Sequence, residues 1–275
     1  MTDSAVAEVV GRLNAGSRRR YSLGQASGDG WHSVQEIASD RSILDGWHQT
    51  ILERRVDGRP AVAAAGLAGQ LSAWLAEVTV IPLVSEGRSF VIQPADVTLH
   101  WNADGWVDAA SLGSPALVEA DRLPEAARGI AEVARPLLEA RPSQGRFGRL
   151  AAWGMLADSI LGQAAGWARQ HGSDSHAACG LGTRLLDLVE QASGVRLRSR
   201  VEAYELDGGE VAVPIRSTCC LIYQVRERPE SSIDGYCDTC PLISDADRVG
   251  PVLEGLREEQ RLVAEGSASQ RSPRS

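Results

Sequence analysis

Four of the five cysteines in this 275-residue chain lie within 22 residues near its C-terminus, as the adjacent pair Cys219 and Cys220 and the pair Cys237 and Cys240. The fifth, Cys179, stands apart. In a reducing compartment, cysteines crowded in this way indicate metal or redox chemistry more than structural disulfides. Four thiolates can complete either a tetrahedral zinc site or the ligand set of a [2Fe–2S] cluster.

The spacing of the cysteines only partly separates these alternatives. The Cys237-x-x-Cys240 turn is common to zinc and iron sites. The adjacent pair is less usual, because neighbouring side chains on a strand point to opposite faces, so that joint ligation requires a bend where the strand ends. Structural zinc sites usually separate paired cysteines by two to four residues. The motif therefore favours an iron–sulfur cluster, with zinc and a redox dithiol as alternatives.

Length, charge and hydropathy narrow the class of protein. A chain of this length that is 43% hydrophobic can bury a core without the help of a metal. Its net charge is −8 and every basic residue is arginine, which argues against a nucleic-acid partner. The N-terminus lacks a signal-peptide pattern, and the most apolar segments, 61–76 and 150–168, both contain Gly and Gln. We expect no transmembrane segment and a cytoplasmic location, either free or peripheral to a membrane.

Hydrophobic periodicity predicts an α+β fold that is mostly helical, with a small antiparallel sheet. The second helix opens with Ser33 and Glu36 at capping-box spacing, and Gly194 is well placed as a helix stop. The predicted helices cover residues 5–14, 33–55, 61–77, 122–140, 145–170 and 175–193. The predicted strands cover residues 78–84, 89–92 and 97–101, followed by a turn at 102–105 into 106–107.

The C-terminal part is predicted to begin with a hairpin of residues 195–206 and 210–215, which leads directly into the four-cysteine segment. We expect four parts in the chain. They are a mixed, largely helical domain (1–195), the hairpin with the cluster-binding segment (196–244), a terminal helix (245–265) and a disordered tail (266–275).

The cysteines stand in a longer motif, Arg216-x-x-Cys-Cys-Leu-x-Tyr223 followed by Cys237-x-x-Cys-Pro-Leu242. This motif resembles that of the ferric siderophore reductases of the FhuF type. The segment Leu-Ala-Ala-Trp-Gly at 150–154 resembles that family's Leu-Trp-Gly helix in looser form. The similarity covers roughly residues 70–242, but the match is specific only in the last 25 residues of that range.

The resemblance implies that Cys219, Cys220, Cys237 and Cys240 hold one [2Fe–2S] cluster and that the protein reduces Fe(III)-siderophores to release Fe(II). Two features depart from the family. The spacer between the cysteine pairs is longer, with the extra residues within 226–234, and the chain continues past Leu242. Loops lengthen at small entropic cost, so we expect ligation to be retained.

The expected partners are a ferric siderophore of hydroxamate or mixed type and an external electron donor. Gly180-Leu-Gly182 lacks both the third glycine and the preceding strand of a dinucleotide site. A ferredoxin or an NAD(P)H-dependent reductase is therefore the expected donor. Arg216 and Tyr223 flank the cysteines and are candidates to neutralise or hydrogen-bond the cluster, and Trp153 is the tryptophan expected to contact substrate.

Two other classes of function compete with the reductase. A siderophore-binding or biosynthesis-related module could use the four cysteines for a structural zinc, and would then be colourless and transfer no electrons. An iron–sulfur sensor could report cellular iron through a partner, although the acidic composition and the lack of a DNA-reading motif disfavour it.

Overall fold

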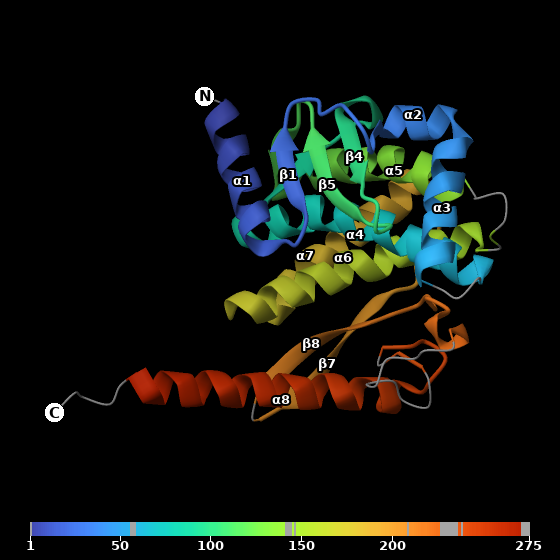
Figure 1. Cartoon of the computed structure of the whole chain (residues 1–275). Helices are drawn as coiled ribbons and strands as arrows, with labels where there is room; N and C mark the ends of the chain where they lie inside the picture. The colour runs from blue at the N-terminus through green and yellow to red at the C-terminus, as the bar shows by residue number, and fades with distance from the viewer. Residues whose placement is uncertain are drawn as a thin grey trace.

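The computed structural model describes residues 2–55, 59–140, 145, 147–207, 209–225, 236–237 and 239–270. A mixed sheet and the N-terminal helices lie on one side of a layer of long helices, and a hairpin with the C-terminal helix lies on the other (Figure 1). The expected α+β class is confirmed. The sheet is not antiparallel throughout, because its first strand pairs in parallel with a later one.

The N-terminal helices follow the predicted positions with one break. Helix α1 covers Thr2–Gly16, and the predicted helix 33–55 is divided into α2 (Val34–Ser39) and α3 (Arg41–Arg55). The capping box between Ser33 and Glu36 is present. The break falls at Asp40, whose backbone is extended and whose carboxylate accepts hydrogen bonds from the backbone and hydroxyl of Ser42. A local side-chain hydrogen bond of this kind competes with the backbone hydrogen bonds of a continuous helix, so α2 ends and α3 begins here.

The main sheet has the strand order β1-β5-β4-β2. Its strands are β1 (Arg20–Leu23), β2 (Trp31–Ser33), β4 (Val97–Trp101) and β5 (Val107–Leu112). A separate antiparallel pair joins β3 (Arg88–Val91) to β6 (Ala116–Glu119). Residues 97–101 match the predicted strand, while β1, β2 and β6 are too short to show a clear alternation in the sequence.

Helix α4 (Pro60–Glu86) corrects one expectation. Residues 78–84, predicted as a strand, form its C-terminal part. Their β-branched side chains are typical of strands, but a helix already formed extends at one hydrogen bond per residue, and 78–83 are all buried in the core. The helix ends at Gly87, in the left-handed conformation (φ 71°) that favours glycine.

Length and composition would also allow α4 to cross a membrane, and it is the one such helix in the described part of the chain. In its most apolar window 83% of the residues are buried inside the protein. It is therefore packed as the core helix of a folded domain.

Three further helices complete the core: α5 (Leu123–Glu139), α6 (Arg149–His171) and α7 (Ser175–Ser193). Each lies within a few residues of its predicted position. Gly194 ends α7 in the left-handed conformation (φ 69°), as expected. One large hydrophobic cluster runs through the sheet and these helices, and Trp74 and Trp153 are its largest fully buried side chains.

The C-terminal part consists of the hairpin β7 (Arg200–Leu206) and β8 (Gly209–Ile215) and helix α8 (Asp245–Gln270). Residues 195–199, predicted as strand, form the connection from α7. Figure 1 shows α8 lying along the hairpin, with Val213, Ile215 and Val249 in a small second hydrophobic cluster. The helix extends to Gln270 instead of 265, since each added turn costs little once a helix exists.

Two sequence predictions lie outside the described residues. The longer spacer expected within 226–234 is one, and the last residues of the chain, 271–275, are the other. The proposed division into domains stays a prediction.

Candidate metal centre

The segment 216–221, which carries the first two cysteines, leaves β8 and runs against α6. The two elements approach very closely at Gly154 on α6. A Cβ atom at this position would overlap Oγ1 of Thr218 and lie 3.3 Å from its Cβ. Only glycine permits this approach, and Thr218 is the residue directly before Cys219.

Asp158, one turn further along α6, holds the same segment through its backbone. Its carboxylate accepts hydrogen bonds from the N–H groups of Ser217 (2.9 Å) and Thr218 (3.1 Å) and from the hydroxyl of Ser199 (2.5 Å). Arg216 Nε adds a contact at 3.5 Å. Burial raises the pKa of Asp158, and the surrounding donors oppose that rise. A buried carboxylate with this many donors fixes the path of the chain into the cysteines.

The bend that adjacent cysteine ligands require is present. Strand β8 ends at Ile215, and Leu221 has a positive φ of 61°, which is uncommon for a residue with a branched side chain. The Leu221 N–H donates to Cys219 Sγ at 3.4 Å. Cys219 and Cys220 are thus followed by a tight turn, and the second cysteine pair forms another, closed by the Cys240 N–H on the Cys237 carbonyl at 2.8 Å.

One thiol of each segment meets one of the other. Cys220 Sγ and Cys237 Sγ are 3.9 Å apart. Two thiolates on one tetrahedral metal, each about 2.3 Å from it, lie roughly 3.8 Å apart. The Cys220–Cys237 separation is therefore the one that two ligands of the same metal need.

Within the part of the chain that the structure describes, no three His, Cys, Asp or Glu side chains gather round a single metal position. The one close thiol pair, Cys220 with Cys237, is of a kind common to zinc and [2Fe–2S] sites.

Arg216 brings positive charge to this site. Its Nη1 lies 3.9 Å from Cys237 Sγ and 3.3 Å from Thr239 Oγ1, and its Nη2 donates to the Thr218 carbonyl at 3.2 Å. Burial lowers the pKa of Arg216, but the charges of Asp158, Cys220 and Cys237 outweigh it and the net pKa is raised. Arg216 is therefore a permanent cation beside the thiols, as the sequence suggested it could be.

The contact between Cys220 and Cys237 shifts their pKa values in opposite directions. The hydrogen bond with Cys237 lowers the pKa of Cys220 to about 5, and the Ile222 N–H and Arg216 act in the same direction. The same hydrogen bond raises the pKa of Cys237. Burial raises the pKa of Cys219 to about 11. Metals bind thiolates, so a metal bound at this site would release protons from these cysteines.

An open groove lies beside the cysteines. It has a volume of about 510 Å³ and is lined by Phe147, Leu150, Ala151, Gly154, Arg196, Arg198, Ser217, Thr218, Cys219 and Leu221. Cys219 is thereby accessible from a cleft large enough for a small-molecule ligand. The cysteine segment thus borders a surface cleft formed with α6.

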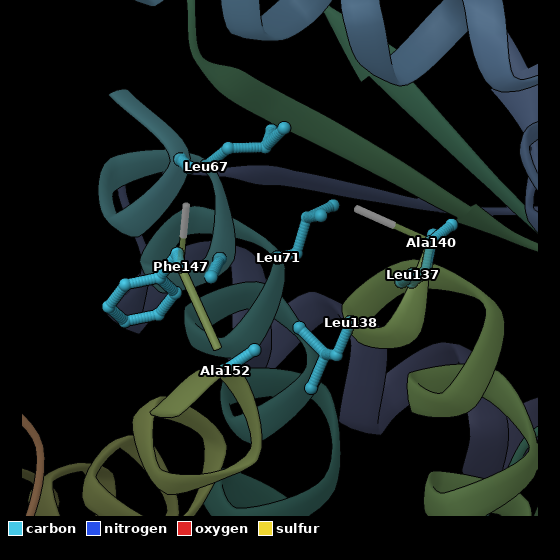
Figure 2. Close-up of a pocket in the computed structure, with 9 residues that line it drawn as sticks. Leu67, Leu71, Leu137, Leu138, Ala140, Phe147 and Ala152 are labelled. Atoms are coloured by element: carbon cyan, nitrogen blue, oxygen red, sulfur yellow. The ribbon is translucent and has the colours of Figure 1, made fainter. Parts of the chain in front are cut away.

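A second, much smaller cavity lies behind Phe147, between α4, α5 and α6 (Figure 2). Leu67, Leu71, Leu137, Leu138 and Ala152 are among the side chains around it, and its volume is about 20 Å³. A space of this size has room for about one water molecule, and an apolar lining offers that water few partners. It is a packing defect of the core and not a ligand site.

The other residues singled out from the sequence have different surroundings. The expectation that Trp153 contacts substrate is wrong, because its side chain is fully buried and its Nε1 donates to Glu139 at 3.1 Å. Tyr223 is half-buried and packs against Tyr236, with ring centroids 5.4 Å apart. Cys179 is buried in α7, away from the four-cysteine segment.

Sequence reasoning missed Asp158, Arg196 and Arg198. Asp158 is the single acid in the apolar stretch 150–161, and a lone carboxylate in such a stretch needs partners if it is buried. Its isolation in the sequence could therefore have identified Asp158 as a candidate buried, hydrogen-bonded carboxylate. Nothing in the sequence indicated that Arg196 and Arg198 lie beside Cys219.

No protein-family model matches this chain, and no curated protein matches its sequence. The resemblance to the ferric siderophore reductases therefore rests on the sequence motifs alone.

Proposed function

We propose that the protein is a [2Fe–2S] ferric-siderophore reductase that uses Cys219, Cys220, Cys237 and Cys240 as cluster ligands. The observation that carries this proposal is the meeting of Cys220 and Cys237 across the two segments, 3.9 Å apart, next to Cys219 in the wall of an open groove. In the proposed centre, Cys220 and Cys237 would bind one metal, and Cys219 and Cys240 would bind the other.

A bound [2Fe–2S] cluster supplies one electron at a time, which is what the conversion of Fe(III) to Fe(II) consumes. Siderophores hold Fe(III) through hard oxygen donors, and Fe(II) is held far less tightly, so reduction releases the metal. An external one-electron donor, a ferredoxin or an NAD(P)H-dependent reductase, would restore the electron.

The residues around the thiols have separate tasks in this proposal. A four-thiolate cluster carries net negative charge, which Arg216, whose Nη1 lies 3.9 Å from Cys237 Sγ, would offset. The Leu221 N–H donates to Cys219 Sγ, the kind of bond that tunes the potential of a cluster. Asp158 and Gly154 position the segment so that Cys219 lines the groove and the electron has a short path to a bound chelate.

The first experiment is anaerobic purification, followed by iron and sulfide analysis and EPR after dithionite reduction. The proposal expects two irons and two sulfides per chain and an S = ½ signal that Cys237→Ser loses or alters. Cys179→Ser is the matched control and should leave the signal unchanged. Colourless protein with one zinc per chain would instead support the siderophore-binding module with a structural zinc.

The second experiment is a single-turnover assay of ferric-chelate reduction. Reduced protein is mixed with one equivalent of a ferric trihydroxamate, and Fe(II) is trapped by a ferrous-specific chromophoric chelator. One Fe(II) per reduced cluster, formed as the cluster absorption recovers, is the expected result. A loaded cluster that reduces no ferric chelate, but alters the binding of a partner protein, would favour a sensor.

A further inference from the structure

The groove beside Cys219 contains two arginines, Arg196 and Arg198. Both belong to the connection between α7 and β7, and both are exposed. Neither guanidinium makes an ion pair or hydrogen bond within the residues that the structure describes. A guanidinium is charged at every physiological pH and matches carboxylate and other anionic oxygens with two parallel donors.

The neighbouring arginines behave differently. Arg200, two residues further on, pairs with Glu202 and Asp245, both at 2.7 Å. Arg248 is paired with Asp245 as well. In a chain with 36 acidic and 28 basic residues, acidic partners are abundant. Two arginines that pair with no acid among the described residues therefore concentrate positive potential in one cleft of an otherwise acidic protein.

Part of the groove lining is apolar. Leu150 is 67% exposed, and Phe147 and Leu221 also line the cleft. A volume of about 510 Å³ is typical of small-molecule sites. The groove thus combines an apolar surface, two cations and a thiol, which is a suitable lining for a compact metal chelate with anionic groups on one side.

We propose that this groove binds ferric chelates of net negative charge, with carboxylate or catecholate donors, and that Arg196 and Arg198 hold their anionic oxygens. The inference rests on the proposed function and narrows its substrate class. Within the expected hydroxamate or mixed siderophores, it selects those that also carry carboxylate or catecholate groups. The two arginines also reduce the repulsion between an anionic chelate and the anionic centre at Cys219.

The test separates binding from electron transfer by using Ga(III), which has the charge of Fe(III) and is not reduced here. The probes are Ga(III) citrate, Ga(III) tris-catecholate and the neutral Ga(III) tris-acetohydroxamate. Each is titrated calorimetrically into the cluster-loaded protein at low and high salt. The variants are Arg196→Gln/Arg198→Gln and the control Arg18→Gln/Arg184→Gln, which removes two exposed arginines that do not line the groove.

We expect the anionic chelates to bind at least tenfold more tightly than the neutral one at low salt. The groove variant should lose that preference and the control should keep it. Equal affinity for all three chelates, or no effect of the groove variant, would overturn the proposal. If the protein reduces ferric chelates but shows no preference for anionic ones, the proposed reductase function is kept and the groove proposal is refuted. If anionic chelates bind tightly but receive no electron, the reductase function is refuted and the groove is kept as their binding site.

Discussion

A methyl group added at Gly154 tests the close approach of α6 to the segment that carries Cys219. In Gly154→Ala the new Cβ would overlap Thr218 Oγ1, well inside the 3.0 Å below which real Cβ contacts essentially never fall. Rotation of the threonine gives little relief, because its own Cβ would be 3.3 Å away and its N–H is bound to Asp158. The segment before Cys219 must therefore move.

The size of the effect follows from two opposing contributions. Extra volume in a well-packed site costs about 1–3 kcal/mol. Alanine is a better helix former than glycine by about 1 kcal/mol, which opposes it. At Gly162, on the same helix, an added Cβ would meet nothing within 4 Å, so Gly162→Ala shows the helix effect alone. Relative to Gly162→Ala, we expect Gly154→Ala to lower the free energy of unfolding by about 1–3 kcal/mol, or Tm by several degrees.

The assay is denaturant unfolding of both variants together with their iron content. Gly154→Ala should also bind less iron, because Cys219 directly follows the displaced residue. Thr218→Ala removes the clashing oxygen, so the double variant should recover most of the stability and iron. Equal stability and iron content of Gly154→Ala and Gly162→Ala would refute the close approach of α6 to this segment.

Four further predictions concern other residues. Asp158→Ala should cost about 3–5 kcal/mol in unfolding free energy, because it leaves the partly buried Arg216 cation and two backbone donors without their carboxylate; a loss under about 1 kcal/mol would contradict this. Arg216→Gln should lower the reduction potential of the loaded centre in a spectroelectrochemical titration, since a cation stabilises the more negative reduced form; an unchanged potential would remove its electrostatic role. Burial raises the pKa of Cys179 to about 11, so iodoacetamide should label it on the order of 100-fold more slowly than a free thiol at neutral pH. Peptide mass spectrometry before and after denaturation measures this, and fast native labelling would contradict it. Burial, and then the charge of Glu77, raise the pKa of Tyr21 well above 10, so its stabilising contribution is complete below pH 10 and is lost as pH rises beyond it. Tyr21→Phe should lose about 1.5 kcal/mol at neutral pH and show a shallower alkaline decline than the wild type, whereas parallel curves would refute the assignment.

Local signals in the sequence determined much of the secondary structure. The capping box at Ser33 and the helix stop at Gly194 depend on contacts within four residues, and both are present. The strand 97–101 and the hairpin before the cysteines follow from alternation and turn residues. The four-cysteine motif likewise identified the ligand candidates from spacing alone. Such signals can be read without the fold because the atoms involved are neighbours in the chain.

Only the tertiary structure decided how distant residues meet. Residues 78–84 have strand-forming side chains but are helical, because the packing around α4 outweighs local preference. Trp153 is enclosed in the core while Gly154 beside it receives the cysteine segment, a distinction that depends on which face of α6 meets 216–221. The contact of Cys220 with Cys237 and the gathering of Phe147, Arg196 and Cys219 around one groove join parts of the chain that are far apart in the sequence. Sequence spacing cannot show such contacts, since they exist only after the chain has folded.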